Sequence, residues 1–146
     1  MNVVLKNYEI LNNIEWLKQF MQYELPVKVG WNLTKNMKKF ESAWKSFVEF
    51  ESELVNKYAL KDETGKIKYD DNGQPKFAPV NKDKFNKEHN DLYMCENTLD
   101  ILKIKYSDLE ESKIKSSLLF DLNYMIEDDS VTDDASERNM KQIQAN

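Results

Sequence analysis

An apolar stripe at helical spacing is the feature that most constrains the fold of this chain. Its members are Met37, Phe40, Trp44, Phe47, Leu54 and Tyr58, and Glu51 is the one residue that interrupts the rhythm. Because residues three or four apart share one face of an α-helix, the stripe predicts a long amphipathic helix that ends at about Lys61. A stripe of this kind locates a core, but it carries no reactive group.

A first helix is predicted upstream of this stripe. Residues 2–8 have the composition of a short strand, and a helical period then runs from Glu9 to Leu25. We expect Pro26 to end that helix, because the residue before a proline disfavours the α region. Residues 27–32 then form a connector that contains Gly30, and the two helices pack against each other as an antiparallel hairpin.

The pattern changes to turn chemistry after the long helix. Asn72 and Gly73 form a favoured turn dipeptide, so residues 66–79 are predicted to form a β-hairpin that Pro75 and Pro79 keep at the edge of a sheet. Asn81 is the expected cap of a further helix that ends near Asn97. Its shared face is expected to carry Phe85, His89 and Leu92, with Cys95 as a further candidate.

The C-terminal third is predicted to add one strand and a short amphipathic segment. Residues 99–106 alternate, which places Leu102, Ile104 and Tyr106 inward. Ser107 and Glu110 have the spacing of a capping box. The apolar residues of the segment that follows are Leu118, Leu119, Leu122, Met125 and Ile126.

Together these segments predict an α+β fold. A long helical hairpin packs on a small, mostly antiparallel sheet made of the N-terminal strand, the 66–79 hairpin and the 99–106 strand. Residues 1–127 are expected to form a single α+β domain. Residues 128–146 are expected to form an acidic C-terminal tail, because they offer too little apolar surface to bury.

Composition narrows the class of function. The formal net charge is -5 and Arg138 is the only arginine, so nucleic-acid binding is disfavoured, because arginine supplies the fork that reads bases and phosphates. A single cysteine, Cys95, fits a reducing compartment. No stretch is long and apolar enough for a membrane span, and the N-terminus has no export pattern. We therefore expect a cytoplasmic location and no contact with a membrane.

No catalytic or ligand-binding set emerges from the residues. His89 is the only histidine, and no nucleophile in a strained-turn motif accompanies it. One histidine and one cysteine cannot supply a structural zinc site, and three scattered glycines cannot cradle a phosphate. The sequence predicts no enzyme, no cofactor and no metal. The enzymatic alternative would place a pocket around His89, Glu88 or Tyr93.

The residues most suited to bind a protein partner are exposed aromatic and acidic side chains. The aromatic candidates are Trp31, Tyr69 and Phe77, since aromatics dominate interface energetics, although packing against the helices is the competing interpretation. The acidic candidates are Asp70, Asp71, Asp128, Asp129, Asp133 and Asp134. Carboxylates of this kind can steer a chain toward a basic protein surface.

Short motifs in a consistent order resemble an uncharacterised family of small bacteriophage and prophage proteins of low-GC bacteria. The motifs are LPVKV at 25–29, NLTKNMKK at 32–39, KYALKDETG at 57–65, DDNG at 70–73, FNKEHNDL at 85–92, SDLE at 107–110 and MIE at 125–127. The resemblance covers most of residues 3–127. It carries over no catalytic residue, and the aromatic content of the second helix and the acidic extension depart from the family pattern.

Two functions follow from the resemblance and from the absent catalytic set. The leading hypothesis is a non-enzymatic phage accessory protein of the host cytoplasm that binds another host or phage protein and inhibits a host enzyme or a defence complex. The alternative is a structural component of the virion or of tail assembly, in which an exposed edge strand and the acidic tail make lattice contacts. The sequence leaves the identity of the partner and the oligomeric state open.

Overall fold

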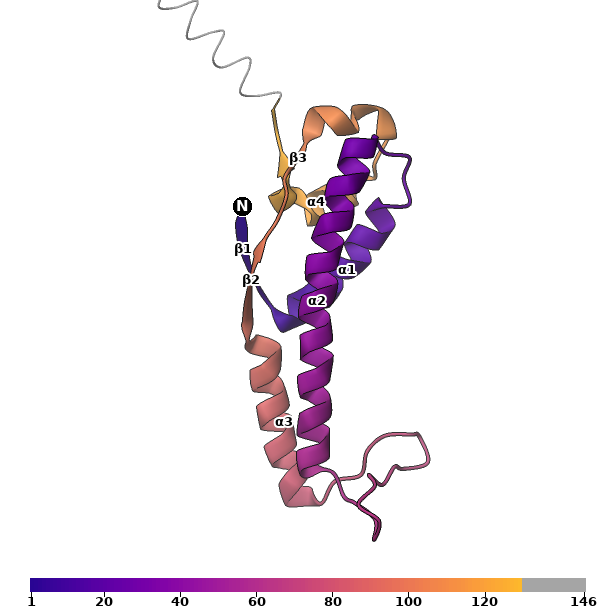
Figure 1. The fold of residues 1–146 in the computed structure, drawn as a ribbon, viewed down its shortest axis with the longest axis vertical. Helices are drawn as coiled ribbons and strands as arrows, with labels where there is room; N and C mark the ends of the chain where they lie inside the picture. The colour runs from indigo at the N-terminus through magenta and orange to yellow at the C-terminus, as the bar shows by residue number, and fades with distance from the viewer. Residues whose placement is uncertain (130–146) are drawn as a thin grey trace, which may run out of the picture.

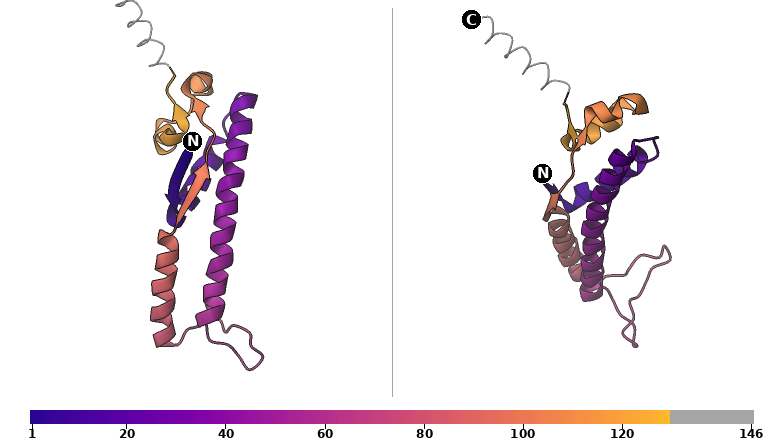
Figure 2. Two further views of the ribbon diagram at one scale, coloured as in Figure 1. Left: turned by 60° about the vertical axis from the view of Figure 1, so that its left-hand side comes forward. Right: turned by 45° about the horizontal axis from the view of Figure 1, so that its top comes forward.

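One long helix forms the spine of the molecule (Figure 1). The computed structural model describes residues 1–129, and in it helix α2 comprises Val27–Tyr58, 32 residues. At 1.5 Å per residue this helix is about 48 Å long. Two further helices pack against it at different heights: α1 lies along its first half and α3 along its second half (Figure 2).

The start of α2 corrects the predicted connector. Helix α1 comprises Asn7–Phe20 and ends before Pro26, which is the N-cap of α2 rather than the stop of α1. Residues 27–32 are helical, and Gly30 already donates its N–H to the carbonyl of Pro26. A proline near a helix start loses nothing, because its missing N–H would have no intrahelical partner there.

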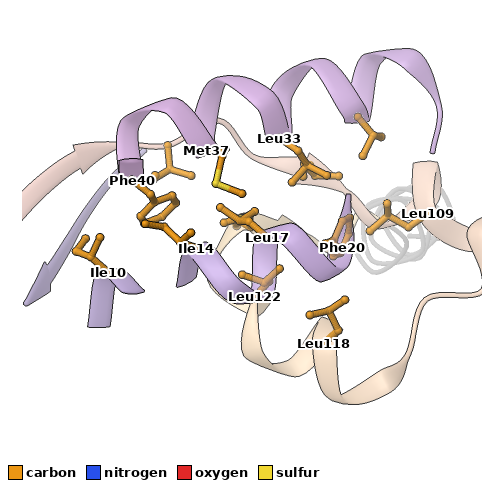
Figure 3. Packing of buried hydrophobic residues seen from close by; sticks show 14 residues of the cluster. Ile10, Ile14, Leu17, Phe20, Leu33, Met37, Phe40, Leu109, Leu118 and Leu122 are labelled. Carbon is orange, nitrogen blue, oxygen red and sulfur yellow. The ribbon is translucent and has the colours of Figure 1, made fainter. Parts of the chain in front are cut away.

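The main core lies between α1 and the first half of α2. Figure 3 shows Leu33, Met37 and Phe40 of α2 facing α1. The α1 side of this interface is formed by Ile10, Ile14, Leu17 and Phe20. Leu109, Leu118, Leu122 and Met125 close the core from the C-terminal third of the chain. Full burial of each such side chain contributes about 1.5 to 3 kcal/mol, which accounts for the stability of this half.

The sheet is smaller than predicted and has two separate parts. Strand β1, Asn2–Lys6, pairs antiparallel with β2, Glu96–Asp100. Strand β3, Ile104–Lys105, pairs parallel with β4, Ile126–Glu127. Residues 66–79 belong to neither pair, so the predicted third member of the sheet is absent from the described part of the chain.

Asn36 explains why the predicted 99–106 strand is broken. Its side chain donates to the carbonyl of Leu102 at 2.9 Å and accepts from the N–H of Leu102 at 2.8 Å. These two bonds from α2 replace ladder bonds, because each backbone group has a single main partner to satisfy. The chain bends there. Ile101 is therefore buried instead of Leu102, which the alternation had predicted to point inward. Tyr106, which was also predicted to point inward, is exposed.

The C-terminal elements are short. They are the 3-10 helix η1 (Tyr106–Ser112), helix α4 (Ser116–Asp121) and the 3-10 turn η2 (Asn123–Met125). The expected capping box is not formed, since Ser107 instead donates its hydroxyl and its backbone N–H to Asp129. This contact ties the end of the described chain to the start of η1.

Helix α3, Pro79–Met94, begins two residues before the predicted cap at Asn81 and ends before Asn97. The ring of Pro79 fixes a backbone angle that suits the first helical position, which explains the earlier start. None of its 16 residues is fully buried, so α3 covers α2 without a further layer on its outer side.

The predicted fold class is confirmed: long helices pack together, with a small antiparallel sheet beside them. Residues 130–146, including Asp133 and Asp134 of the predicted acidic tail, lie outside the described residues. Within residues 1–129, none of the helices has the length and apolar character needed to cross a membrane.

Candidate functional site

The second half of α2, helix α3 and the segment between them extend away from the main core. We call residues 45–95 the projection, and within it we call residues 60–77 the arm. The main core cluster contains no member from the projection. Figure 1 shows the arm leaving the far end of the two helices as a long loop. The projection therefore exposes both of its faces and its tip.

Two tight turns shape the arm. Asp62 accepts hydrogen bonds from the backbone N–H groups of Thr64 and Lys66, and Asp70 accepts from those of Asn72 and Gln74, at 2.8 to 3.0 Å. Each turn ends on a glycine with positive φ, Gly65 at 83° and Gly73 at 77°. The turn predicted at Asn72 and Gly73 is therefore present, although single bridges replace a continuous hairpin.

Hydrogen bonds also lower the pKa of the carboxyl group in the first turn. The hydroxyl of Thr64 donates to the Asp62 carboxylate at 2.6 Å. This bond, followed by the backbone N–H bond from Lys66, lowers the pKa of the Asp62 carboxyl. The arm therefore holds its shape through a charged acceptor at neutral pH.

A series of ring contacts joins the arm to the two helices. Phe77 at the base of the arm lies 4.7 Å from Phe85 of α3, centroid to centroid. His89 follows at 5.1 Å from Phe85, and Tyr93 lies 4.6 Å beyond His89. Tyr93 in turn lies 5.2 Å from Phe47 of α2. Aromatic pairs at these distances contribute about 0.5 to 1.5 kcal/mol beyond their buried area.

The one polar residue in the α2 stripe meets the one histidine. Glu51 Oε2 lies 2.7 Å from His89 Nε2, and both side chains are largely covered. This contact is absent from the sequence predictions, which placed Glu88 and Tyr93, and not Glu51, beside His89. The signal was present, because an isolated polar residue on a buried stripe requires a polar partner on the facing helix.

The opposite flank of the projection carries a groove of about 610 Å³, which we call the flank groove. Its apolar lining is Phe50 and Leu54 from α2, Leu92 from α3, and the exposed thiol of Cys95, which directly follows α3. Its charged lining is Glu53, Lys57, Glu88 and Asp91. Lys57 and Glu88 form an ion pair at 3.5 Å across it. Phe50, which is 49% exposed, is the aromatic most open to a partner there.

The predicted binding residues do not form one surface. Tyr69 projects from the arm and is 57% exposed, and Asp71 beside it is exposed as well. Asp70 instead accepts the hydrogen bonds of its own turn, and Phe77 packs on Phe85, so their roles are structural. The competing interpretation of Phe77 as a packing residue is the one that the ring contact supports.

The other candidates lie at a distance from the arm. Trp31 is exposed on the first turns of α2, about 40 Å along the helix from Tyr58, with the Nζ atom of Lys35 5.1 Å from its ring centroid. Asp128 is exposed, and Asp129 accepts from Ser107, which lowers the pKa of the Asp129 carboxyl. Of the seven candidate residues that the structure places, Tyr69, Asp70 and Asp71 are exposed and adjacent, and of these Asp70 is engaged in its own turn.

The geometry around His89 supports packing more than chemistry. Its ring is stacked on Phe85 and paired with Glu51, while Cys95 lies on the flank groove and donates to the carbonyl of Asp91. Within residues 1–129, no group of three or more His, Cys, Asp or Glu side chains is placed to hold a metal ion. Comparisons with protein-family models, with curated proteins and with solved structures give no match for this chain.

Proposed function

We propose that this chain is a non-enzymatic accessory protein of a bacteriophage that acts by binding another protein through its projection. The observation that carries the proposal is that exposed aromatic and aliphatic side chains stand on a thin two-helix structure outside the core. A surface of this kind, rimmed by charged residues, is typical of protein-binding sites. The bound partner would be a host enzyme or a defence complex, inhibited by occlusion.

Tyr69 and Phe50 have the properties of binding anchors. Aromatic side chains supply large contact areas with few rotatable bonds, and they are enriched among the residues that dominate binding energy. Tyr69 is held between the two capped turns of the arm, and Phe50 forms one wall of the flank groove. Ordered turns reduce the entropy lost on binding, which favours affinity.

The experiment is affinity capture from cells infected by a phage that encodes the chain. The full-length protein is expected to retain a specific partner, and the double variant Tyr69→Ala, Phe50→Ala is expected to lose it. Phe120→Ala is the matched control, because Phe120 is 79% exposed but lies on α4, outside the projection. Retention of the same partner by the double variant, or its loss by the control, would contradict the proposal.

The alternative function is a component of the virion or of tail assembly. Its support is the two-stranded sheet, whose strands β1 and β2 each leave one edge without a neighbouring strand from residues 1–129. Open edges are sites at which another chain can add a strand. Mass spectrometry of purified particles separates the two functions, because a structural protein is present there in stoichiometric amounts and a cytoplasmic inhibitor is not.

A further inference from the structure

A second groove lies between α2 and the open edge of β2, away from the flank groove. We call it the edge groove; its volume is about 770 Å³. The α2 side is lined by Lys35, Lys38, Lys39, Ser42, Ala43 and Ser46, and the β2 side by residues 96–99. The three small residues leave space beside the strand where longer side chains would fill it.

The backbone of β2 offers unpaired groups to this groove. The pairs Asn7 with Cys95 and Met1 with Ile101 are hydrogen-bonded and continue the β1–β2 register on either side. In an antiparallel pair, bonded and non-bonded positions alternate, so the N–H and C=O of Thr98 point away from β1. Within residues 1–129, no hydrogen bond outside the ladder reaches the Thr98 backbone.

The charged residues that line the edge groove indicate which kind of segment could bind there. Lys35 and Lys38 are exposed, whereas Lys39 already donates to the carbonyl of Asp100 at one end. Glu96 is the single carboxylate among the ten lining residues. A smaller cavity of about 90 Å³ between α2 and β3 has a mixed lining, in which Lys28, Lys103 and Lys105 lie beside Asp108 and Glu127. The edge groove itself is basic, with three lysines against one glutamate in its lining, on a chain whose net charge is -5.

We propose that the edge groove binds an extended, acidic segment of a partner protein as an additional strand beside β2. Backbone bonds to Thr98 would supply affinity without sequence preference, and the lysines of α2 would select carboxylates on the incoming strand. This inference goes beyond the proposed function, because it concerns another surface and does not depend on Tyr69 or Phe50. A strand edge favours a peptide over a nucleic acid, because a nucleic acid has no peptide N–H and C=O groups that could continue the hydrogen bonds of the sheet.

The test begins with selection of random displayed peptides on the full-length protein. The enriched peptides are expected to be acidic and poor in proline, and a synthetic peptide of the leading sequence should slow exchange of the Thr98 amide. Lys35→Glu and Lys38→Glu are each expected to weaken binding of that peptide roughly tenfold, since like charges are then opposed. Lys45→Glu is the matched control, because Lys45 is on α2 but does not line the groove.

A variant that leaves the charge unchanged tests the strand-addition geometry. Ser42→Trp fills the groove at an exposed position and is expected to abolish binding of the peptide without altering the helix. Four outcomes would overturn the proposal: enriched peptides without an acidic excess, an unprotected Thr98 amide in the complex, protection of that amide in the free chain, or displacement of the peptide by single-stranded DNA. Protection in the free chain would mean that the protein's own residues fill the groove.

Discussion

Asn36 shows how a single buried polar residue determines the path of the chain. Its side chain is fully buried, and both ends of its amide are bonded to the backbone of Leu102. Asn13 has a similar role on α1, where it donates to the carbonyl of Glu9 and accepts from the hydroxyl of Tyr124. Burial of the Tyr124 ring raises the pKa of its hydroxyl, which keeps it a neutral donor.

Replacement of Asn36 is expected to be costly. In Asn36→Ala the N–H and the C=O of Leu102 lose their partner in a partly buried site, where an orphaned backbone group costs about 1 to 3 kcal/mol. We expect the free energy of unfolding, measured with urea, to fall by roughly 3 kcal/mol. Asn12→Ala, at an exposed position on α1, is the control and should change it by less than about 0.5 kcal/mol. Equal effects of the two variants would contradict the role assigned to Asn36.

Substitutions of two neighbouring aromatic residues on α2, Phe47 and Phe50, are expected to have different effects on stability and on partner binding. Phe47 is 3% exposed and contacts Trp44 and Tyr93, so Phe47→Ala should lower the free energy of unfolding by about 3 to 5 kcal/mol. Phe50 is about half exposed, so Phe50→Ala should change stability little while it weakens partner binding. Thermal unfolding and affinity capture of the two proteins check this. A reversed order, with the larger loss of stability in Phe50→Ala, would show that the assignment of inner and outer faces is wrong.

At the scale of elements, the periodic patterns were sufficient to predict the helices. Four members of the α2 stripe, Met37, Phe40, Phe47 and Leu54, are buried as their spacing predicts. The sheet could not be predicted to the same degree, because its interruption depends on a tertiary contact from Asn36 that no local pattern records. Likewise, Pro26 separates two helices in either interpretation, and only the structure shows which helix it adjoins.

The first turn of the arm is expected to weaken in acid. The pKa of Asp62 is lower in the folded turn than its ordinary value of about 3.9, so its contribution is present at neutral pH and is lost as the pH falls through the folded pKa. Amide resonances of Thr64 and Lys66 should therefore lose dispersion below about pH 4 before the core unfolds. Asp62→Asn should remove this transition. If the two amides are unaffected down to the pH of global unfolding, the carboxylate does not hold the turn.

At the scale of the whole molecule, stability and binding are assigned to different halves. The main core lies between α1, the first half of α2 and the C-terminal third, and the projection adds its own smaller set of ring contacts. The candidate binding surface could be predicted only in part. The exposure of Tyr69 could be predicted from the turn residues around it. The flank groove could not, because it depends on the packing of α2 against α3 and has no sequence signature.

Because the main core lies outside the projection, we predict that the arm is dispensable for folding. Replacement of residues 61–76 by a short Gly/Ser linker leaves Ala59 and Phe77 in place and removes no member of the core. We expect the midpoint of thermal unfolding to move by only a few degrees, because loop length changes closure entropy slowly. Capture of the partner should be lost. A linker variant that captures the partner normally would exclude the arm from the interface.

Hydrogen exchange of the captured complex tests the central claim most directly. If the protein acts through its projection, amides of residues 45–95 should gain protection in the complex, with the largest changes around Tyr69 and along the flank groove. The core half, including α1, should keep the exchange rates of the free protein. Protection confined to α1 and the C-terminal third, with none in the projection, would contradict the account.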